Sequence, residues 1–118
     1  MSNLFVSLHS KLLKMKEKVG LLPKRLFNYR KRKKYNQTDV AKAIGISTDM
    51  YSKIELGKRM MQDEYLPQIA ELLEIDINDL RVMYLADKIE AEVDRFPSNI
   101  ADKALNIIQD KYASLRNE

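Results

Sequence analysis

Apolar residues recur at intervals of three and four along most of the chain, which is the spacing that places them on one face of an α-helix. The first such stripe runs from Leu4 to Val19 and predicts an amphipathic helix over about 3–19 that ends near Gly20. Further helices are predicted at about 23–34, 37–44, 48–56, 64–73 and 76–93, with a last helix from 98 onward. No period-two alternation persists, so the sequence predicts an all-α fold.

Short polar residues and a glycine mark the ends of the predicted helices. Ser47 is placed to cap the helix predicted at 48–56, and Gly45 allows the turn just before that helix. Asp76 or Asn78 can cap the penultimate helix, and Ser98 can cap the last one. The middle of the chain is therefore predicted to hold two short helices joined by a tight turn.

Composition removes several classes of function. The 118 residues include no cysteine and one histidine, which excludes disulfides, thiolate metal sites and His-cluster zinc, and gives no basis for a Ser-His-Asp triad. No Gly-rich phosphate loop occurs, and the carboxylates are scattered over predicted helices. We therefore expect a protein that is not an enzyme and that needs neither a metal nor another cofactor.

The hydrophobic runs are short. None approaches the roughly 20 apolar residues that span a bilayer, and none has the length of a signal-peptide core. A cytoplasmic protein without a membrane partner is expected. A chain of this size buries only part of its apolar surface, so a second subunit is also expected.

Charge is distributed unevenly, although the net charge is only +4. Up to Arg59 there are 15 basic residues against 4 acidic ones, and beyond it 6 basic residues stand against 13 acidic ones. Because the acidic part cannot lie on the same phosphate surface as the basic part, the asymmetry indicates a polyanionic partner for the first half. A basic helix face that is merely solvated is the alternative.

The stretch from Gln37 to Arg59, QTDVAKAIGISTDMYSKIELGKR, combines several features that one geometry requires. Ala41 is small enough to let two helices cross closely, and Gly45 allows the turn between them. Five apolar residues are predicted to point inward from the two helices, namely Val40, Ile44, Ile46, Tyr51 and Ile54. A chance pair of amphipathic helices would not place all of these in one register, so the stretch predicts a helix-turn-helix.

On these residues the sequence resembles the phage-repressor and Cro type of helix-turn-helix, the Xre-like family of bacterial and phage regulators. The likeness covers about 22–80 and includes Gln37, the run from Val40 to Ser47, and Ile54-Glu55-Leu56-Gly57-Lys58-Arg59. It implies a five-helix DNA-binding domain whose third helix enters the major groove, as a dimer on an inverted-repeat operator. The chain then divides into an amphipathic N-terminal arm (1–21), the helix-turn-helix domain (22–80) and a C-terminal helical extension (81–118), the expected dimerisation region.

The resemblance makes the helix at 48–56 the recognition helix and assigns two groups of residues to DNA. The outward residues at its start and one turn further on are expected to read bases: Ser47, Thr48, Asp49, Ser52 and Lys53. Phosphate contacts are expected from Gln37, at a helix N-terminus, and from Lys42, Lys58 and Arg59. For Thr48 and Asp49 the alternative is a role confined to the first turn, where polar and acidic residues stabilise the helix.

The resemblance also implies a structural ion pair between Arg30 and Glu55. Two residues depart from the family's pattern. Lys34 stands where the first helix is often ended by a glycine, and it is expected to add charge without changing the fold. Tyr51 fills an inward position usually held by an aliphatic residue, and it requires a larger pocket or a hydrogen-bond partner for its phenol.

The leading function is therefore a sequence-specific DNA-binding transcriptional regulator, a dimeric repressor whose partner is double-stranded DNA. A DNA-binding antitoxin and the control protein of a restriction-modification operon remain open within the same class. A different class is a protein-interaction module on a helix-turn-helix scaffold, with a protein partner on the C-terminal helices. For the arm at 1–21 the open roles are a flap that completes the core, a partner-binding helix, and a basic anchor.

Overall fold

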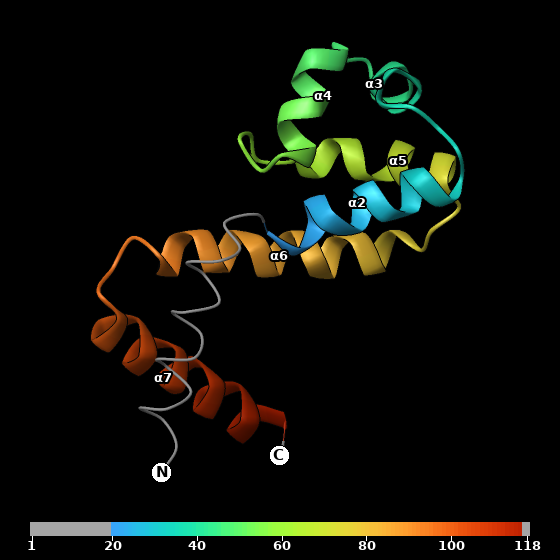
Figure 1. The fold of residues 1–118 in the computed structure, drawn as a ribbon. Helices are drawn as coiled ribbons and strands as arrows, with labels where there is room; N and C mark the ends of the chain where they lie inside the picture. The colour runs from blue at the N-terminus through green and yellow to red at the C-terminus, as the bar shows by residue number, and fades with distance from the viewer. Residues whose placement is uncertain (1–19, 117–118) are drawn as a thin grey trace. The chain divides into compact units, whose positions relative to one another are not determined.

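The computed structural model describes residues 20–116, and this part of the chain contains helices and no strand (Figure 1). The elements are α2 (Leu21–Arg32), α3 (Gln37–Ile44), α4 (Thr48–Glu55), the 3₁₀ turn η1 (Asp63–Tyr65), α5 (Leu66–Leu73), α6 (Ile77–Val93) and α7 (Ser98–Arg116). The predicted all-α fold with a helix-turn-helix is confirmed. The helix predicted over 3–19 lies outside the described residues, together with almost all of the predicted arm.

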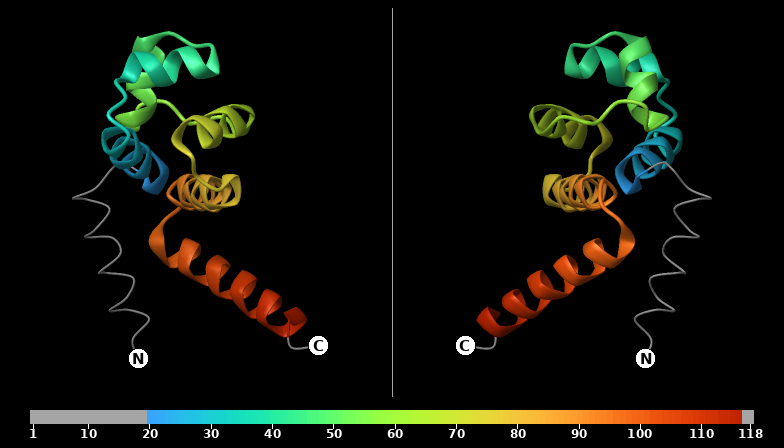
Figure 2. Two further views of the ribbon diagram at one scale, coloured as in Figure 1. Left: turned by 90° about the vertical axis from the view of Figure 1, so that its right-hand side faces the viewer. Right: turned by 90° about the vertical axis from the view of Figure 1, so that its left-hand side faces the viewer.

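The chain divides into two compact units, with a boundary inside α6 between Lys88 and Ile89. The hydrophobic core lies in the unit that ends at Lys88, where α3 packs against α4 and α5, and α2 packs against α4 (Figures 1 and 2). Its buried apolar residues are Leu22, Leu26, Val40, Ala41, Ile44, Tyr51, Ile54, Met61, Leu66, Ile69, Ala70, Leu73, Leu80 and Met83. Four of the five residues predicted to point inward from the helix-turn-helix are in this set, and Ile46 is partly buried against it.

The start of α2 is capped by a carboxylate from α6. Asp87 accepts hydrogen bonds from the backbone N–H groups of Leu21, at 2.8 Å, and Leu22, at 2.9 Å. These groups have no partner within the first turn of a helix, so the carboxylate allows α2 to begin two residues before the predicted start at 23. Gly20 leaves room for this contact, because a Cβ there would lie 2.6 Å from Oδ2 of Asp87.

The end of α2 passes through a strained residue. Lys34 has a φ of 62°, in the left-handed region that glycine enters without steric cost. The backbone N–H of Tyr35 closes the turn by donating to the carbonyl of Arg30 at 3.1 Å. The helix therefore ends where a glycine would end it, and Lys34 carries the backbone strain that a glycine would avoid.

A capping box starts α3 and a left-handed glycine ends it. The side chain of Asn36 accepts from the N–H of Asp39 at 2.8 Å, and the carboxylate of Asp39 accepts from the N–H of Asn36 at 2.9 Å. Gly45 has a φ of 76°, and its N–H bonds back to the last turn of α3. The hydroxyl of Ser47 then accepts from the N–H of Met50 at 3.1 Å, so Ser47 caps α4 as predicted.

The helix predicted at 64–73 is divided in two. The turn η1 comes first, and the α-helix begins only at Leu66, with Pro67 in its first turn. Glu74, with a φ of 55°, ends α5 in the left-handed conformation. The carboxylate of Asp76 accepts from the N–H of Asn78 at 2.8 Å, so Asp76, one of the two predicted candidates, caps α6.

Within the described residues, the second unit contains the end of α6 and the 19-residue helix α7. Ser98 is the first helical residue of α7, and the carbonyl of Pro97 accepts from the N–H groups of Ile100, at 3.1 Å, and Ala101, at 3.0 Å. The predicted cap at Ser98 is therefore wrong by one residue, because Pro97 takes the flanking position. No helix in the described part of the chain has the length and apolar character needed to cross a membrane.

Candidate nucleic-acid interface

Helix α4 has one side in the core and one side in solvent. Tyr51 is fully buried and Ile54 nearly so, which fixes the rotation of the helix about its axis. The other side carries the residues that were predicted to read bases, which we call the α4 face: Ser47, Thr48, Asp49, Ser52 and Lys53. All of these are exposed except Ser52, which is half-buried. Because positions 48 and 52, and 49 and 53, are one helical turn apart, they form a single outward surface.

Two residues of the α4 face are joined by an ion pair. Nζ of Lys53 lies 3.1 Å from Oδ2 of Asp49, one turn away on the same helix. Both side chains are well exposed, so the pair contributes only about 0.3–0.5 kcal/mol and opens at little cost when another partner approaches. Both charged groups are therefore available to a ligand.

Thr48 is held in place from the preceding helix. Its hydroxyl donates to the hydroxyl of Thr38 at 3.1 Å, across the turn between α3 and α4. Thr38 was not among the predicted site residues, because nothing in a linear sequence shows that positions ten residues apart touch. The bond fixes the side chain that stands at the start of the α4 face.

The residues predicted to bind phosphate lie on two segments beside α4. Gln37 is the first residue of α3, where backbone N–H groups point out of the helix end, and Lys42 is exposed in the last turn of the same helix. Lys58 and Arg59 are exposed and follow Gly57, whose φ of 76° reverses the chain after α4. The backbone N–H groups of Lys58 and Arg59 both donate to the carbonyl of Lys53, which holds this turn against the end of the helix.

Arg30 and Glu55 form the ion pair that the resemblance implied. Nε of Arg30 lies 2.7 Å from Oε2 of Glu55, and the second amino nitrogen donates to Oε1 at 3.0 Å, so the pair is bidentate. Burial acts to raise the pKa of Glu55, but the hydrogen bonds from Arg30 and Gln37 outweigh it and hold this pKa below its ordinary value. The pair therefore stays ionised and ties the middle of α2 to the end of α4.

Gln37 belongs to the same buried network. Its side-chain Nε2 donates to Oε1 of Glu55 at 3.2 Å. The bond joins the start of α3 to the end of α4, so three helices meet at one carboxylate. This bond uses one of the two N–H donors of the Gln37 side-chain amide. The second donor and the backbone N–H groups at the start of α3 are left for the predicted phosphate contact.

Tyr51 lies beside this network with its side chain fully buried. Its hydroxyl makes no hydrogen bond of good geometry within the described residues. Burial raises the pKa of Tyr51 above its ordinary value, and the nearby carboxylate of Glu55 raises it further. Of the two alternatives expected for a tyrosine at this position, the fold provides the larger pocket and leaves the phenol without a well-placed hydrogen-bond partner.

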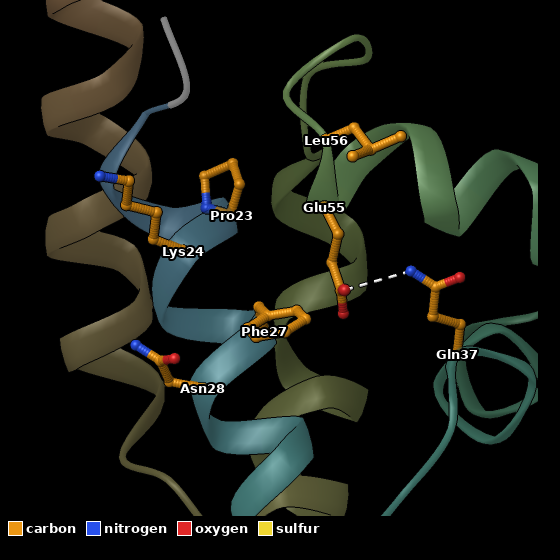
Figure 3. Close-up of a pocket in the computed structure, with 7 residues that line it drawn as sticks. All are labelled: Pro23, Lys24, Phe27, Asn28, Gln37, Glu55 and Leu56. Atoms are coloured by element: carbon orange, nitrogen blue, oxygen red, sulfur yellow. Dashed lines mark hydrogen bonds between the residues drawn. The ribbon is translucent and has the colours of Figure 1, made fainter. Parts of the chain in front are cut away.

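A pocket of about 350 Å³ opens beside the network (Figure 3). It is lined by Pro23, Lys24, Phe27, Asn28, Gln37, Glu55 and Leu56, and Figure 3 shows the Gln37–Glu55 hydrogen bond in its wall. Phe27 is about half-exposed, and the cationic groups of Arg30 and Lys31 lie 5.4 and 5.6 Å from its ring centroid. Sequence periodicity did not single out Phe27, because it lies beside the buried stripe of α2 and not within it.

Comparison with known proteins agrees with this geometry. A family model described as helix-turn-helix matches residues 26–80. The "ImmF control region 10 kDa protein" of Bacillus phage phi105 is 34% identical over 89 residues, which cover 75% of this chain and 96% of the relative. No solved structure matches the chain. With its Gly45 turn, its exposed α4 face and this match across nearly the whole of a phage protein, the chain belongs to the phage-repressor and Cro-type (Xre-like) helix-turn-helix family of DNA-binding regulators.

Proposed function

We propose that the chain is a transcriptional repressor, two copies of which bind an inverted-repeat operator and cover a promoter. In this proposal each copy places α4 in the major groove of one half-site. The observation that carries the proposal is the division of α4 between a fully buried side, set by Tyr51 and Ile54, and an outward α4 face of short polar and charged groups. A helix whose rotation is fixed by packing can present the same atoms to every duplex that it meets.

The chemistry of the α4 face fits base edges. Lys53 can donate to O6 and N7 of a guanine, and Asp49 can accept from N4 of a cytosine. The methyl group of Thr48, which the bond to Thr38 orients, can pack on the methyl group of a thymine. Because Asp49 and Lys53 are paired in the free protein, recognition exchanges a weak surface ion pair for contacts with a G·C pair.

Phosphate contacts on both sides of α4 set its position in the groove. We assign them to the helix end at Gln37 and to the side chains of Lys42, Lys58 and Arg59. These groups do not distinguish bases, so they supply affinity and orientation. Six phosphates neutralised by a dimer correspond to a slope of about −5 in a plot of log K against log salt concentration.

The phage relative supports a regulatory role over a purely structural one. Its description places that protein in a control region of a phage. The likeness extends over 96% of the relative, so it includes residues beyond the helix-turn-helix. An antitoxin or a restriction-modification control protein would use the same α4 face, and the genes that neighbour this one would distinguish those roles.

Selection of binding sites from random duplexes tests the proposal. The expected product is an inverted repeat whose half-site centres are about 10 bp apart, or a multiple of that spacing. The full chain should be used, with the Lys58→Ala/Arg59→Ala double variant in parallel as a chain with an intact α4 face. If no motif is enriched, and if the chain retards no duplex at low salt, a protein-interaction module on this scaffold is the better description.

A further inference from the structure

Helix α7 carries an apolar face that is open to solvent. Its large apolar residues are between 39% and 68% exposed. They are Ile100, Leu105, Ile107, Ile108, Tyr112 and Leu115. An isolated exposed leucine needs no explanation, but six such residues on one helix form a contiguous surface of the kind that binds a partner.

Part of this face follows the spacing of a coiled-coil seam. Leu105, Ile108, Tyr112 and Leu115 follow one another in steps of three, four and three residues, and all four are exposed. This alternation is the heptad pattern that keeps one stripe directed at a facing helix. We call these four residues the α7 seam.

The size of the face suits a second protein subunit. If a fully exposed large side chain presents about 200 Å², the exposed fractions leave on the order of 600 Å² of apolar surface on each α7. A stable interface of standard size buries about 800 Å² on each partner. The helix therefore supplies most of what one dimer contact requires.

The charges on α7 favour another copy of the same helix. Over Ser98–Arg116 two acidic residues, Asp102 and Asp110, stand against three basic residues, Lys103, Lys111 and Arg116. Two such helices therefore approach with little net repulsion. A helix that lies on an anionic membrane would instead carry an excess of lysine and arginine on its polar side.

We propose that the α7 seam pairs with the α7 seam of a second copy of this chain. The pairing deepens the proposed function, on which its biological role rests, by giving a surface to the dimer that an inverted-repeat operator requires. The association itself needs no DNA. Ile107 and Ile100 lie to one side of the seam and widen the apolar contact.

The first test is the mass of the full chain in solution, measured by sedimentation equilibrium over a range of concentrations without DNA. The expected result is a reversible dimer of twice the 13.8 kDa monomer. Ile108→Lys, in the middle of the seam, should shift the midpoint of dimerisation to at least tenfold higher concentration. Asn106→Lys adds the same charge on the opposite side of α7 and should leave the midpoint unchanged. A monomer at every concentration, or a dimer that Ile108→Lys leaves intact, would overturn the pairing.

Disulfide trapping gives a second readout that does not depend on a destabilised variant. The chain has no cysteine, so introduced ones report only on their own neighbours. The Leu105→Cys/Leu115→Cys variant should cross-link into a covalent dimer in either helix orientation. If each single variant also cross-links the helices are parallel, and if only the double variant does so they are antiparallel, because Leu115 then faces Leu105 of the other copy. Asn106→Cys should not cross-link, and equal trapping at Asn106 and at the seam would contradict the proposal.

These measurements separate this inference from the proposed function. If the chain is monomeric but still enriches a half-site motif, the pairing of α7 helices is refuted and the DNA-binding role stands. If the chain dimerises through the α7 seam but enriches no motif, the pairing stands and the proposed repressor function is refuted.

Discussion

Arg30 and Glu55, which are 25 residues apart in the chain, form a bidentate ion pair whose side chains are only 7% and 3% exposed. The pair joins α2 to the end of the helix that carries the proposed reading surface. A third hydrogen bond, from Gln37, brings α3 to the same carboxylate. The orientation of α4 therefore depends on one glutamate as well as on apolar packing.

Removing that glutamate should destabilise the fold. Glu55→Ala leaves the guanidinium of Arg30 buried without a counter-charge, which is expected to cost about 3–5 kcal/mol of unfolding free energy. Thermal unfolding followed by circular dichroism measures the effect. Glu64→Ala, on an exposed side chain, is the matched control and should change the midpoint little. Equal shifts in the two variants would show that the pair does not hold α4.

The same carboxylate predicts a loss of stability in acid. The pKa of Glu55 is lowered in the folded protein, so the unfolded state takes up the proton first as the pH falls. The stability that the ionised carboxylate of Glu55 contributes is fully present above the pKa of the unfolded state, about 4.3. This stability is lost as the pH falls through the lower pKa of the folded state. Urea denaturation from pH 7 to pH 3 measures this effect. The midpoint of the wild type should exceed that of Glu55→Gln at pH 7, and the difference should shrink below about pH 4.3. An advantage that stays constant across this range would contradict the assignment.

Lys34 offers a gain in stability. Its φ of 62° strains any residue with a Cβ, so Lys34→Gly should stabilise the fold by roughly 0.5–1 kcal/mol after the added flexibility of the unfolded chain is counted. Lys34→Ala removes the charge and keeps the strain, so it should give no such gain. Urea denaturation of the three proteins checks this. A larger gain from alanine than from glycine would mean that charge, and not backbone conformation, is what matters at this position.

The proposed phosphate contacts predict a salt dependence. Each lysine or arginine that neutralises a phosphate contributes about 0.9 to the slope of log K against log salt concentration. Lys58→Ala and Arg59→Ala should therefore weaken binding to all duplexes alike and reduce the slope by about 1 for each lost contact. Fluorescence anisotropy between 50 and 200 mM salt, the range over which such contacts lose roughly 10³–10⁵ in affinity, provides the measurement. Lys103→Ala, in α7, should leave the slope unchanged.

Local signals in the sequence account for the helix-turn-helix. Gly45 and Ser47 each act on the backbone within a few residues, so the turn and the cap of α4 could be placed from residue type alone. The buried stripe on α3 and α4 follows from periodicity in the same way. The capping box of Asn36 and Asp39 could also have been predicted, because an Asx residue followed three positions later by an acid is typical of such a box.

Contacts between distant parts of the chain could not be predicted from such signals. The cap that Asp87 provides for α2 bridges 66 residues and shifts the start of that helix. The bond between Thr38 and Thr48, and the bond from Gln37 to Glu55, likewise arise only when α3 and α4 are packed together. Arg30 and Glu55 were paired through family resemblance, since their spacing of 25 residues carries no local meaning.

In the proposed function the α4 face reads bases, while its neighbours bind only the DNA backbone. Binding-site selection with Lys53→Gln, compared with Lys58→Gln, distinguishes these two roles, because the two variants remove the same charge from the two kinds of position. We predict that Lys53→Gln changes the preferred base at one position of each half-site, whereas Lys58→Gln lowers affinity and keeps the wild-type motif. An unchanged motif with Lys53→Gln, Asp49→Asn and Thr48→Ala alike would show that the α4 face does not read bases.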